Sequence, residues 1–239
     1  GNECFYFIAD LHALTTVRDP GDLRKFTLEL AIDYLAVGLD PARTVFFRQS
    51  DIPEVTELTW ILSTVTPMGL LERCHSYKDK IAKGIEPSHG LFAYPVLMAA
   101  DILIYEADFV PVGIDQLPHL ELTREIGRRF NAFYGDVLPE PQPLLTEYPK
   151  LLGTDGRKMS KSYSNCLYLS DSPEEITKTV MAMVTDPARV RRQDPGNQDV
   201  CPLYTLDQIF APKEWCEHVK RECPKAGIGC VDDKRELLK

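Results

Sequence analysis

The sequence lacks any apolar run near the roughly 18 residues that a membrane-crossing helix needs, so we expect no membrane span. Its start lacks the basic segment and apolar stretch of a secretory signal, so we expect a cytoplasmic protein. In that compartment the seven cysteines are not expected to form a disulfide framework. Internal repeats and low-complexity segments are also absent, and 26% charged residues are typical of an ordinary globular chain.

Positive charge is also in short supply, with 27 Lys and Arg against 36 Asp and Glu and a net charge of −9. An acidic chain binds nucleic acid poorly without local basic patches. The candidate patches are Arg128 with Arg129, and Arg189 with Arg191 and Arg192. Taken alone, each patch is better explained as a solvated helix face.

The first 65 or so residues alternate between buried strands and amphipathic helices. Continuous apolar runs at 4–9 and 44–47 predict strands covered on both faces. Leu23, Phe26, Leu30 and Tyr34 recur at helical spacing, and a second helix starts near Asp51. Strand, helix, strand, helix predicts a parallel sheet with crossover helices, hence the α/β class.

The remainder is mostly helical. The pattern predicts helices at 68–82 and about 94–105, a strand at 109–112, a helix to about 130, and a loop at 138–143. Ser172, with Glu175 three residues on, is a capping box that starts a further helix. A helical tail completes the chain.

The most specific motif is the loop Lys158-Met159-Ser160-Lys161-Ser162, which Gly156 precedes and Asn165 follows. Two ammonium groups three residues apart on a small-residue loop can close over a polyphosphate, because lysine is a flexible point charge. They help most where negative charge develops on a leaving group. The alternative is a solvated basic turn.

A second motif, Gly113-Ile114-Asp115-Gln116, lies between a predicted strand and a helix. Glycine lets the backbone approach a ligand, and an aspartate at the carboxyl end of a strand can accept hydrogen bonds from ribose hydroxyls. Taken alone the motif is weak, because Gly-x-Asp is common in turns.

A third group, Tyr94, Met98 and Asp101, shares one face of a predicted helix. A carboxylate on an otherwise apolar face needs a donor, and an indole N–H is one. Met98 offers a polarisable contact for an aromatic ring. The alternative, favoured from the residues alone, is a core helix in which a protein donor meets Asp101.

These motifs carry a resemblance to a known family. The lysine loop is similar to the KMSKS signature of the class I aminoacyl-tRNA synthetases. Residues 94–103 resemble the amino-acid specificity helix of the tryptophanyl-tRNA synthetase family. The related tyrosyl enzymes have glutamine where Met98 stands, so this residue favours tryptophan. The resemblance extends from Cys4 to about Ser162 and more loosely beyond.

The resemblance implies a Rossmann-like parallel sheet with a helical insertion, followed by a helical domain. Residues 1–165 would be the catalytic domain without its first strand, and 166–239 a truncated anticodon-binding domain. It implies ATP-dependent activation of L-tryptophan and transfer to tRNA(Trp), with Mg²⁺ on ATP. The family acts as a homodimer, for which 69–73 is the expected interface. The rivals are a tyrosyl enzyme and a non-catalytic paralogue that binds tRNA or tryptophan.

The resemblance also assigns roles to residues. Lys158 and Lys161 are the catalytic lysines. The ATP site comprises Gly113, Asp115, Gln116, Lys158, Met159, Ser160 and Lys161. The tryptophan site comprises His12, Tyr94, Met98, Asp101, Val110, Val112 and Gln116. A lone histidine after a strand is more often structural, which is the alternative for His12.

The chain departs from the family pattern in two places. The glycine- and histidine-bearing signature of the first strand is absent, so we expect these 239 residues alone to show little activation activity. Cys201, Cys223 and Cys230 resemble the ligands of a [4Fe–4S] cluster in some members, but the fourth position is Asp233. The alternatives to a cluster are a relic of one and plain buried thiols.

Overall fold

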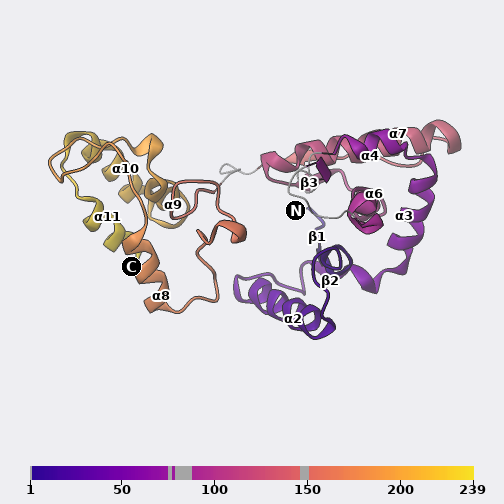
Figure 1. Ribbon diagram of the computed structural model, residues 1–239, viewed down its shortest axis with the longest axis horizontal. Helices are drawn as coiled ribbons and strands as arrows, with labels where there is room; N and C mark the ends of the chain where they lie inside the picture. Colours follow the sequence, from indigo (N-terminus) through magenta and orange to yellow (C-terminus); the bar gives the residue numbers. More distant parts are fainter. Residues whose placement is uncertain (1, 75–76, 79–87, 146–150) are drawn as a thin grey trace. The chain divides into compact units, whose positions relative to one another are not determined.

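The computed structural model describes residues 2–74, 77–78, 88–145 and 151–239. The chain divides into two compact units, Gly1–Thr146 and Glu147–Lys239 (Figure 1). The lysine loop belongs to the second unit by this division. A domain boundary after residue 165 stays a prediction.

Parallel strand pairs with helical crossovers confirm the predicted α/β class in the first unit. β1 (Phe5–Ile8) pairs with β2 (Val45–Arg48), and β3 (Phe109–Pro111) pairs with β4 (Gln142–Leu144). The crossovers contain α1 (Asp10–Ala13) and α2 (Pro20–Ala36) in the first case, and η2 (Ile114–Gln116) and α7 (Leu117–Tyr134) in the second. Among the described residues these strands form two separate two-stranded sheets.

The core of the first unit is helical. α6 (His89–Leu103) packs against α3 (Pro53–Val65), α7 and the short α4 (Met68–Glu72). The buried apolar side chains between these helices are Val55, Leu62, Leu71, Val96, Ala99, Ala100, Leu103, Leu122 and Ile126. This packing fixes α6, the helix that carries Tyr94, Met98 and Asp101.

In the described residues of the second unit, four helices pack around a core of their own. They are α8 (Pro173–Ala182), α9 (Pro202–Phe210), α10 (Lys213–Glu222) and α11 (Cys230–Leu237). Short 3₁₀ turns are η3 (Lys161–Tyr163), η4 (Gln198–Val200) and η5 (Cys223–Lys225). The buried Lys234 donates to the carbonyls of Met181 (2.9 Å) and Met183 (2.6 Å), and so caps the end of α8.

Side-chain caps start several helices, and the sequence predicts one of them. Asp19 accepts from the Asp22 N–H ahead of α2, with Pro20 at its first position. The capping box of Ser172 and Glu175 starts α8, as predicted. η1 (Gln49–Asp51) follows β2 directly, so its first side chain stands at the carboxyl end of a parallel strand.

Helix α6 begins five residues earlier than predicted. Ser88 caps it by accepting from the Leu91 N–H, so Pro95 lies inside the helix and not near its start. Within the helix predicted at 68–82, α4 covers Met68–Glu72 and residues 77–78 are also helical. Most of the remainder of that range lies outside the described residues.

Two further predictions were wrong. Residues 142–143, at the end of the loop predicted at 138–143, belong to β4, in which Pro143 faces Val110 and needs no N–H of its own at that position. β1 is not covered on both faces: Phe5 and Tyr6 are 42% and 40% exposed, although the Phe5 ring stacks on Tyr105. Helix α2 likewise has no buried residue. Of the helices in the described part, none has the length and hydrophobicity to cross a bilayer.

Candidate active site

A buried carboxylate lies at the centre of a polar cluster in the first unit. Asp101, on α6, is 4% exposed. Its Oδ2 lies 2.8 Å from His12 Nε2, so this ring nitrogen donates when Asp101 is a carboxylate. The structure therefore brings His12 and Asp101 together, although 89 positions separate them.

Gln49 completes this cluster, and sequence reasoning missed it. Its Nε2 lies 2.7 Å from Asp101 Oδ1 and 2.8 Å from Oδ2, and its Oε1 accepts from the N–H groups of Leu11 and His12. One signal could have identified it: Gln49 directly follows the parallel strand β2, and α/β sheets place ligand-binding groups at such strand ends.

Aromatic rings flank the cluster. The Tyr94 ring centroid is 6.0 Å from that of His12 and 6.1 Å from that of His119. Because His12 contacts both Tyr94 and Asp101, these two residues face the same side of α6, as their spacing predicts. Burial lowers the pKa of His119, while the charge of Asp115 acts in the opposite direction. His119 is therefore a neutral ring near pH 7.

Protein groups thus donate hydrogen bonds to Asp101. This agrees with the alternative that the residues alone favour, a core helix in which a protein donor meets this carboxylate. A carboxylate has about four acceptor positions, and the three contacts from Gln49 and His12 do not fill them. Oδ1 has a single partner among these contacts. Asp101 can therefore accept one further N–H while its orientation is held by protein groups.

The other residues assigned to the tryptophan and nucleotide sites lie on neighbouring elements. Met98 is half-buried on α6, and Val110 and Val112 are half-buried in and just after β3. Gly113 precedes η2, which contains the exposed Asp115 and Gln116. They occupy the carboxyl end of β3, as the sequence predicts.

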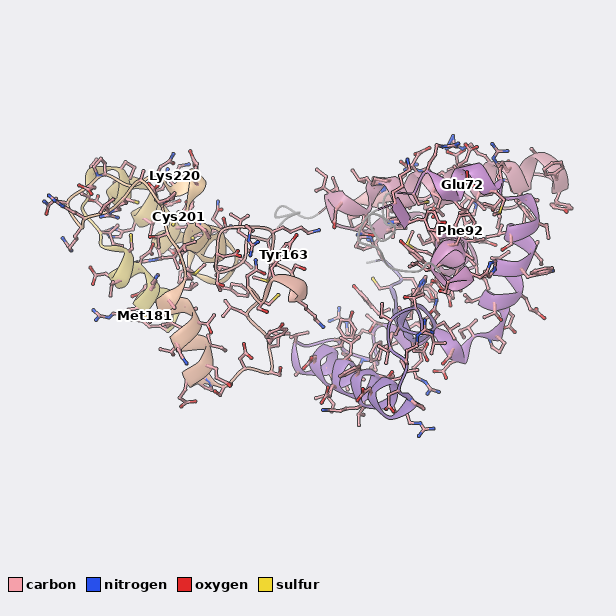
Figure 2. The ribbon with its side chains drawn as sticks, viewed as in Figure 1. Glu72, Phe92, Tyr163, Met181, Cys201 and Lys220 are labelled. Atoms are coloured by element: carbon pink, nitrogen blue, oxygen red, sulfur yellow. The ribbon has the colours of Figure 1, made fainter. Side chains whose placement is uncertain are left out.

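The lysine loop lies in the second unit. Ser160 precedes η3, which begins at Lys161, and the side chains of Lys158 and Lys161 are exposed. The loop is closed by an antiparallel bridge between Leu152 and Lys158. Tyr163, labelled in Figure 2, ends η3 and stacks its ring under the Arg157 guanidinium at 4.5 Å.

The three cysteines of the sequence pattern also lie near one another, but they do not fit an iron–sulfur cluster. Cys201, Cys223 and Cys230 line a cavity of about 10 Å³, room for about one water molecule (Cys201 is labelled in Figure 2). The Arg189 Nη1 lies 3.6 Å from Cys230 Sγ and 3.8 Å from Cys223 Sγ.

Asp233, at the fourth position of the pattern, is also poorly suited to bind a cluster. Asp233 Oδ1 accepts from Trp215 Nε1 at 2.9 Å. No group of three or more His, Cys, Asp or Glu side chains in the described part of the chain is arranged to hold a metal ion. Burial raises the pKa of the Cys201 thiol to about 11, so this side chain is a neutral thiol near pH 7.

Comparison with known sequences places these two sites in context. The family described as tRNA synthetases class I (W and Y) matches residues 1–239. A tryptophan–tRNA ligase of Thermotoga maritima is 50% identical over 244 residues, covering 100% of this chain and 74% of the relative. One from Rhodopirellula baltica is 50% identical over 238 residues, covering 99% and 73%.

Solved structures agree with the sequence matches. Tryptophanyl-tRNA synthetase from Campylobacter jejuni, complexed with ADP and tryptophan, superposes with a TM-score of 0.83 at 42% identity. The match covers 99% of this chain and 74% of that one. Because the family matches the full length, the chain belongs to the class I tRNA synthetases for tryptophan and tyrosine.

Proposed function

We propose that the protein is a tryptophan–tRNA ligase, which activates L-tryptophan with MgATP and transfers it to tRNA(Trp). In the first step a tryptophan carboxylate oxygen attacks the α-phosphorus of ATP, and the bond to the β-phosphate breaks, releasing pyrophosphate. In the second step a ribose hydroxyl at the tRNA end attacks the carbonyl carbon, and AMP leaves. Named relatives at 50% identity support this assignment.

The observation that carries the choice of amino acid is the buried Asp101, oriented by Gln49 and His12 with acceptor capacity left on Oδ1. An indole N–H is a donor only, which suits such an oxygen. Met98 stands one helical turn away and supplies an apolar contact in place of a hydrogen bond. Tyr94 and Gln116 hold the α-amino group, and Val110 and Val112 pack on the ring.

The nucleotide is held by two further groups. Asp115, beside Gly113 at the carboxyl end of β3, accepts from the ribose hydroxyls. Lys158 and Lys161 stabilise the charge that develops on pyrophosphate, and Met159 and Ser160 supply backbone contacts. Positioning and charge stabilisation carry most of the rate enhancement in such transfers.

Transfer of the amino acid requires that tRNA be recognised by an acidic chain. We assign this to the helical region 166–239 as the anticodon-binding domain. Of its basic residues, Arg189 is committed to the carbonyls of Arg192 and Ile228, so Arg191 and Arg192 are the better candidates for phosphate contacts. Because tRNA is a cytoplasmic substrate, we place the protein in the cytoplasm.

We also propose a homodimer. In the predicted interface segment Leu71 is buried in the protein's own core, so it is not available to a partner. The neighbouring Met68 and, on α3, Trp60 are 63% and 74% exposed, and large apolar side chains of this kind are typical of interface cores.

The function is tested by ATP–pyrophosphate exchange with the product of the complete reading frame. We expect exchange that depends on tryptophan, with tyrosine a far poorer substrate, and a loss of tryptophan dependence in Asp101→Ala. Exchange supported equally by tyrosine would contradict the assigned specificity. No exchange with either amino acid would contradict the activity.

A further inference from the structure

Asn165 follows the lysine loop in the sequence and lies buried beneath it. Its side chain is 2% exposed, although the lysines on either side of Met159 are exposed. The amide nitrogen donates to the Lys158 carbonyl at 3.2 Å, and the amide oxygen accepts from the Ser160 N–H at 2.8 Å. One side chain therefore holds the backbone on both sides of Met159.

The same amide nitrogen donates to Asp155 Oδ1 at 2.7 Å. This bond is the main cause that lowers the pKa of Asp155 to about 2. Asp155 in turn accepts from the Arg157 backbone N–H (2.9 Å) and from Arg157 Nε (2.7 Å). Asp155 thus stays ionised at any working pH and links Asn165 to the arginine that stacks on Tyr163.

The backbone at the start of the loop is shaped around Asn165. The Thr154 N–H donates to the Asn165 carbonyl at 3.0 Å. At Gly153 a Cβ would lie 2.3 Å from Asn165 Nδ2 and 2.8 Å from Asn165 O, closer than side-chain carbons approach. Residues 153–165 therefore close on a single buried amide that acts both as donor and as acceptor.

We infer that Asn165 is the positioning residue of the lysine loop in the activation step, an inference that rests on the proposed function. Lys158 and Lys161 have long, exposed side chains. The backbone between them therefore determines which region their ammonium groups can reach. A loop already held in shape need not reorganise as charge develops on the leaving pyrophosphate. Aspartate lacks the donor and alanine lacks both groups, so neither can replace the amide.

The test compares Asn165→Ala with Asn131→Ala in the product of the complete reading frame. Asn131 is the control, because this half-buried residue also binds backbone groups through its side-chain amide, those of Val137 and Leu138, but in the first unit. Hydrogen exchange at 158–160, melting temperature, and kcat and KM for tryptophan in pyrophosphate exchange are measured for each protein.

We expect Asn165→Ala to lose protection at the Ser160 amide and to lower kcat by about 100-fold, with KM for tryptophan changed less than about twofold. Asn131→Ala should lower the melting temperature but leave the Ser160 protection and kcat unchanged. Asn165→Asp places a carboxylate beside Asp155, so one pKa of the pair rises. Its kcat relative to the native protein should recover as pH falls, because the added proton restores a donor.

A kcat loss in Asn165→Ala no greater than in Asn131→Ala, or unchanged Ser160 protection, would overturn the positioning role while exchange by the native protein stands. If the native protein shows no tryptophan-dependent exchange, the proposed function itself is wrong and the positioning role is wrong with it. The two failures are therefore distinguishable in one set of measurements.

Discussion

Gln49 and Asp101 face each other in the interior of the first unit, with the amide nitrogen 2.7 and 2.8 Å from the two carboxylate oxygens. Gln49 is 1% exposed, and its own oxygen accepts the N–H groups of Leu11 and His12. This one side chain therefore ties the ends of β1 and β2 to α6. It sets the direction in which Asp101 can accept a further hydrogen bond.

Removing this amide should weaken tryptophan recognition. In Gln49→Ala, Asp101 loses a hydrogen bond of the charged kind, which contributes about 1.5–3 kcal/mol, so we expect KM for tryptophan to rise about tenfold or more. Gln49→Glu should raise KM for tryptophan further, because two carboxylates would face each other. Gln208→Ala, at an exposed position of α9, is the control and should be neutral.

A tryptophan analogue with sulfur in place of the indole N–H separates recognition from folding. Native protein should discriminate against it in pyrophosphate exchange, and Gln49→Ala should discriminate less, because Asp101 is no longer held toward the donor. Equal discrimination in both proteins would contradict the role assigned to Gln49.

The lysine loop should contribute to the transition state and not to amino-acid binding. We expect Lys158→Ala or Lys161→Ala to lower kcat in pyrophosphate exchange by about 10²–10³-fold, with little change in KM for tryptophan. Lys178→Ala, an exposed lysine on α8, controls for loss of positive charge. A rise in KM for tryptophan at constant kcat would contradict a role of these lysines in the transition state.

Local signals predicted much of this structure. The Ser172 capping box marks a helix start because it depends on side chains within one turn. The shared face of Tyr94 and Asp101 follows from their spacing along the helix. The early start of α6 was not predicted, because a proline is typical of a first helical turn, whereas Pro95 lies inside this helix and Ser88 is its cap.

The features that were not predicted depend on distant partners. Gln49 is an ordinary polar residue until α6 brings Asp101, 52 positions away, against it. β4 exists because β3 offers it hydrogen bonds, such as that from the Val112 N–H to the Leu144 carbonyl. The exposure of Phe5 and Tyr6 likewise depends on what packs against β1, which an apolar run does not specify.

A buried carboxyl group in the second unit should make stability depend on pH. Asp207 is fully buried, and neither of its carboxyl oxygens has a hydrogen-bond partner in the described part of the chain. Burial, and then the charge of Asp233, raise its pKa to about 8 from an ordinary value of 3.8. Between these two values the folded state keeps a proton that the unfolded state releases, so stability falls as pH rises.

Asp207→Asn removes the titrating group and should flatten this dependence. We expect the melting temperature of the variant to exceed that of the native protein by several degrees at pH 9, since each kcal/mol shifts it by roughly 2–4 °C. Near pH 5 the difference should shrink or reverse. If the melting temperatures of the variant and the native protein differ by the same amount at every pH from 5 to 9, Asp207 does not titrate as its surroundings predict.

The cysteine pocket should bind no iron–sulfur cluster. The Arg189 guanidinium contacts two of the three thiols and also donates to the Ile228 carbonyl at 2.6 Å, so a positively charged group lies among the thiols that would hold a cluster. Asp233 is engaged by Trp215.

Anaerobic purification followed by incubation with iron and sulfide tests this directly. We expect a colourless protein with substoichiometric iron, whereas four irons per chain with a visible absorbance shoulder would contradict the expectation. Arg189→Ala supplies a second measurement, because it removes the group that fills the pocket. Its thiols should react faster with a thiol-specific reagent than those of the native protein, in which burial raises the pKa of Cys201 and of Cys223. Equal reaction rates would show that burial by other groups, and not the arginine, protects the thiols.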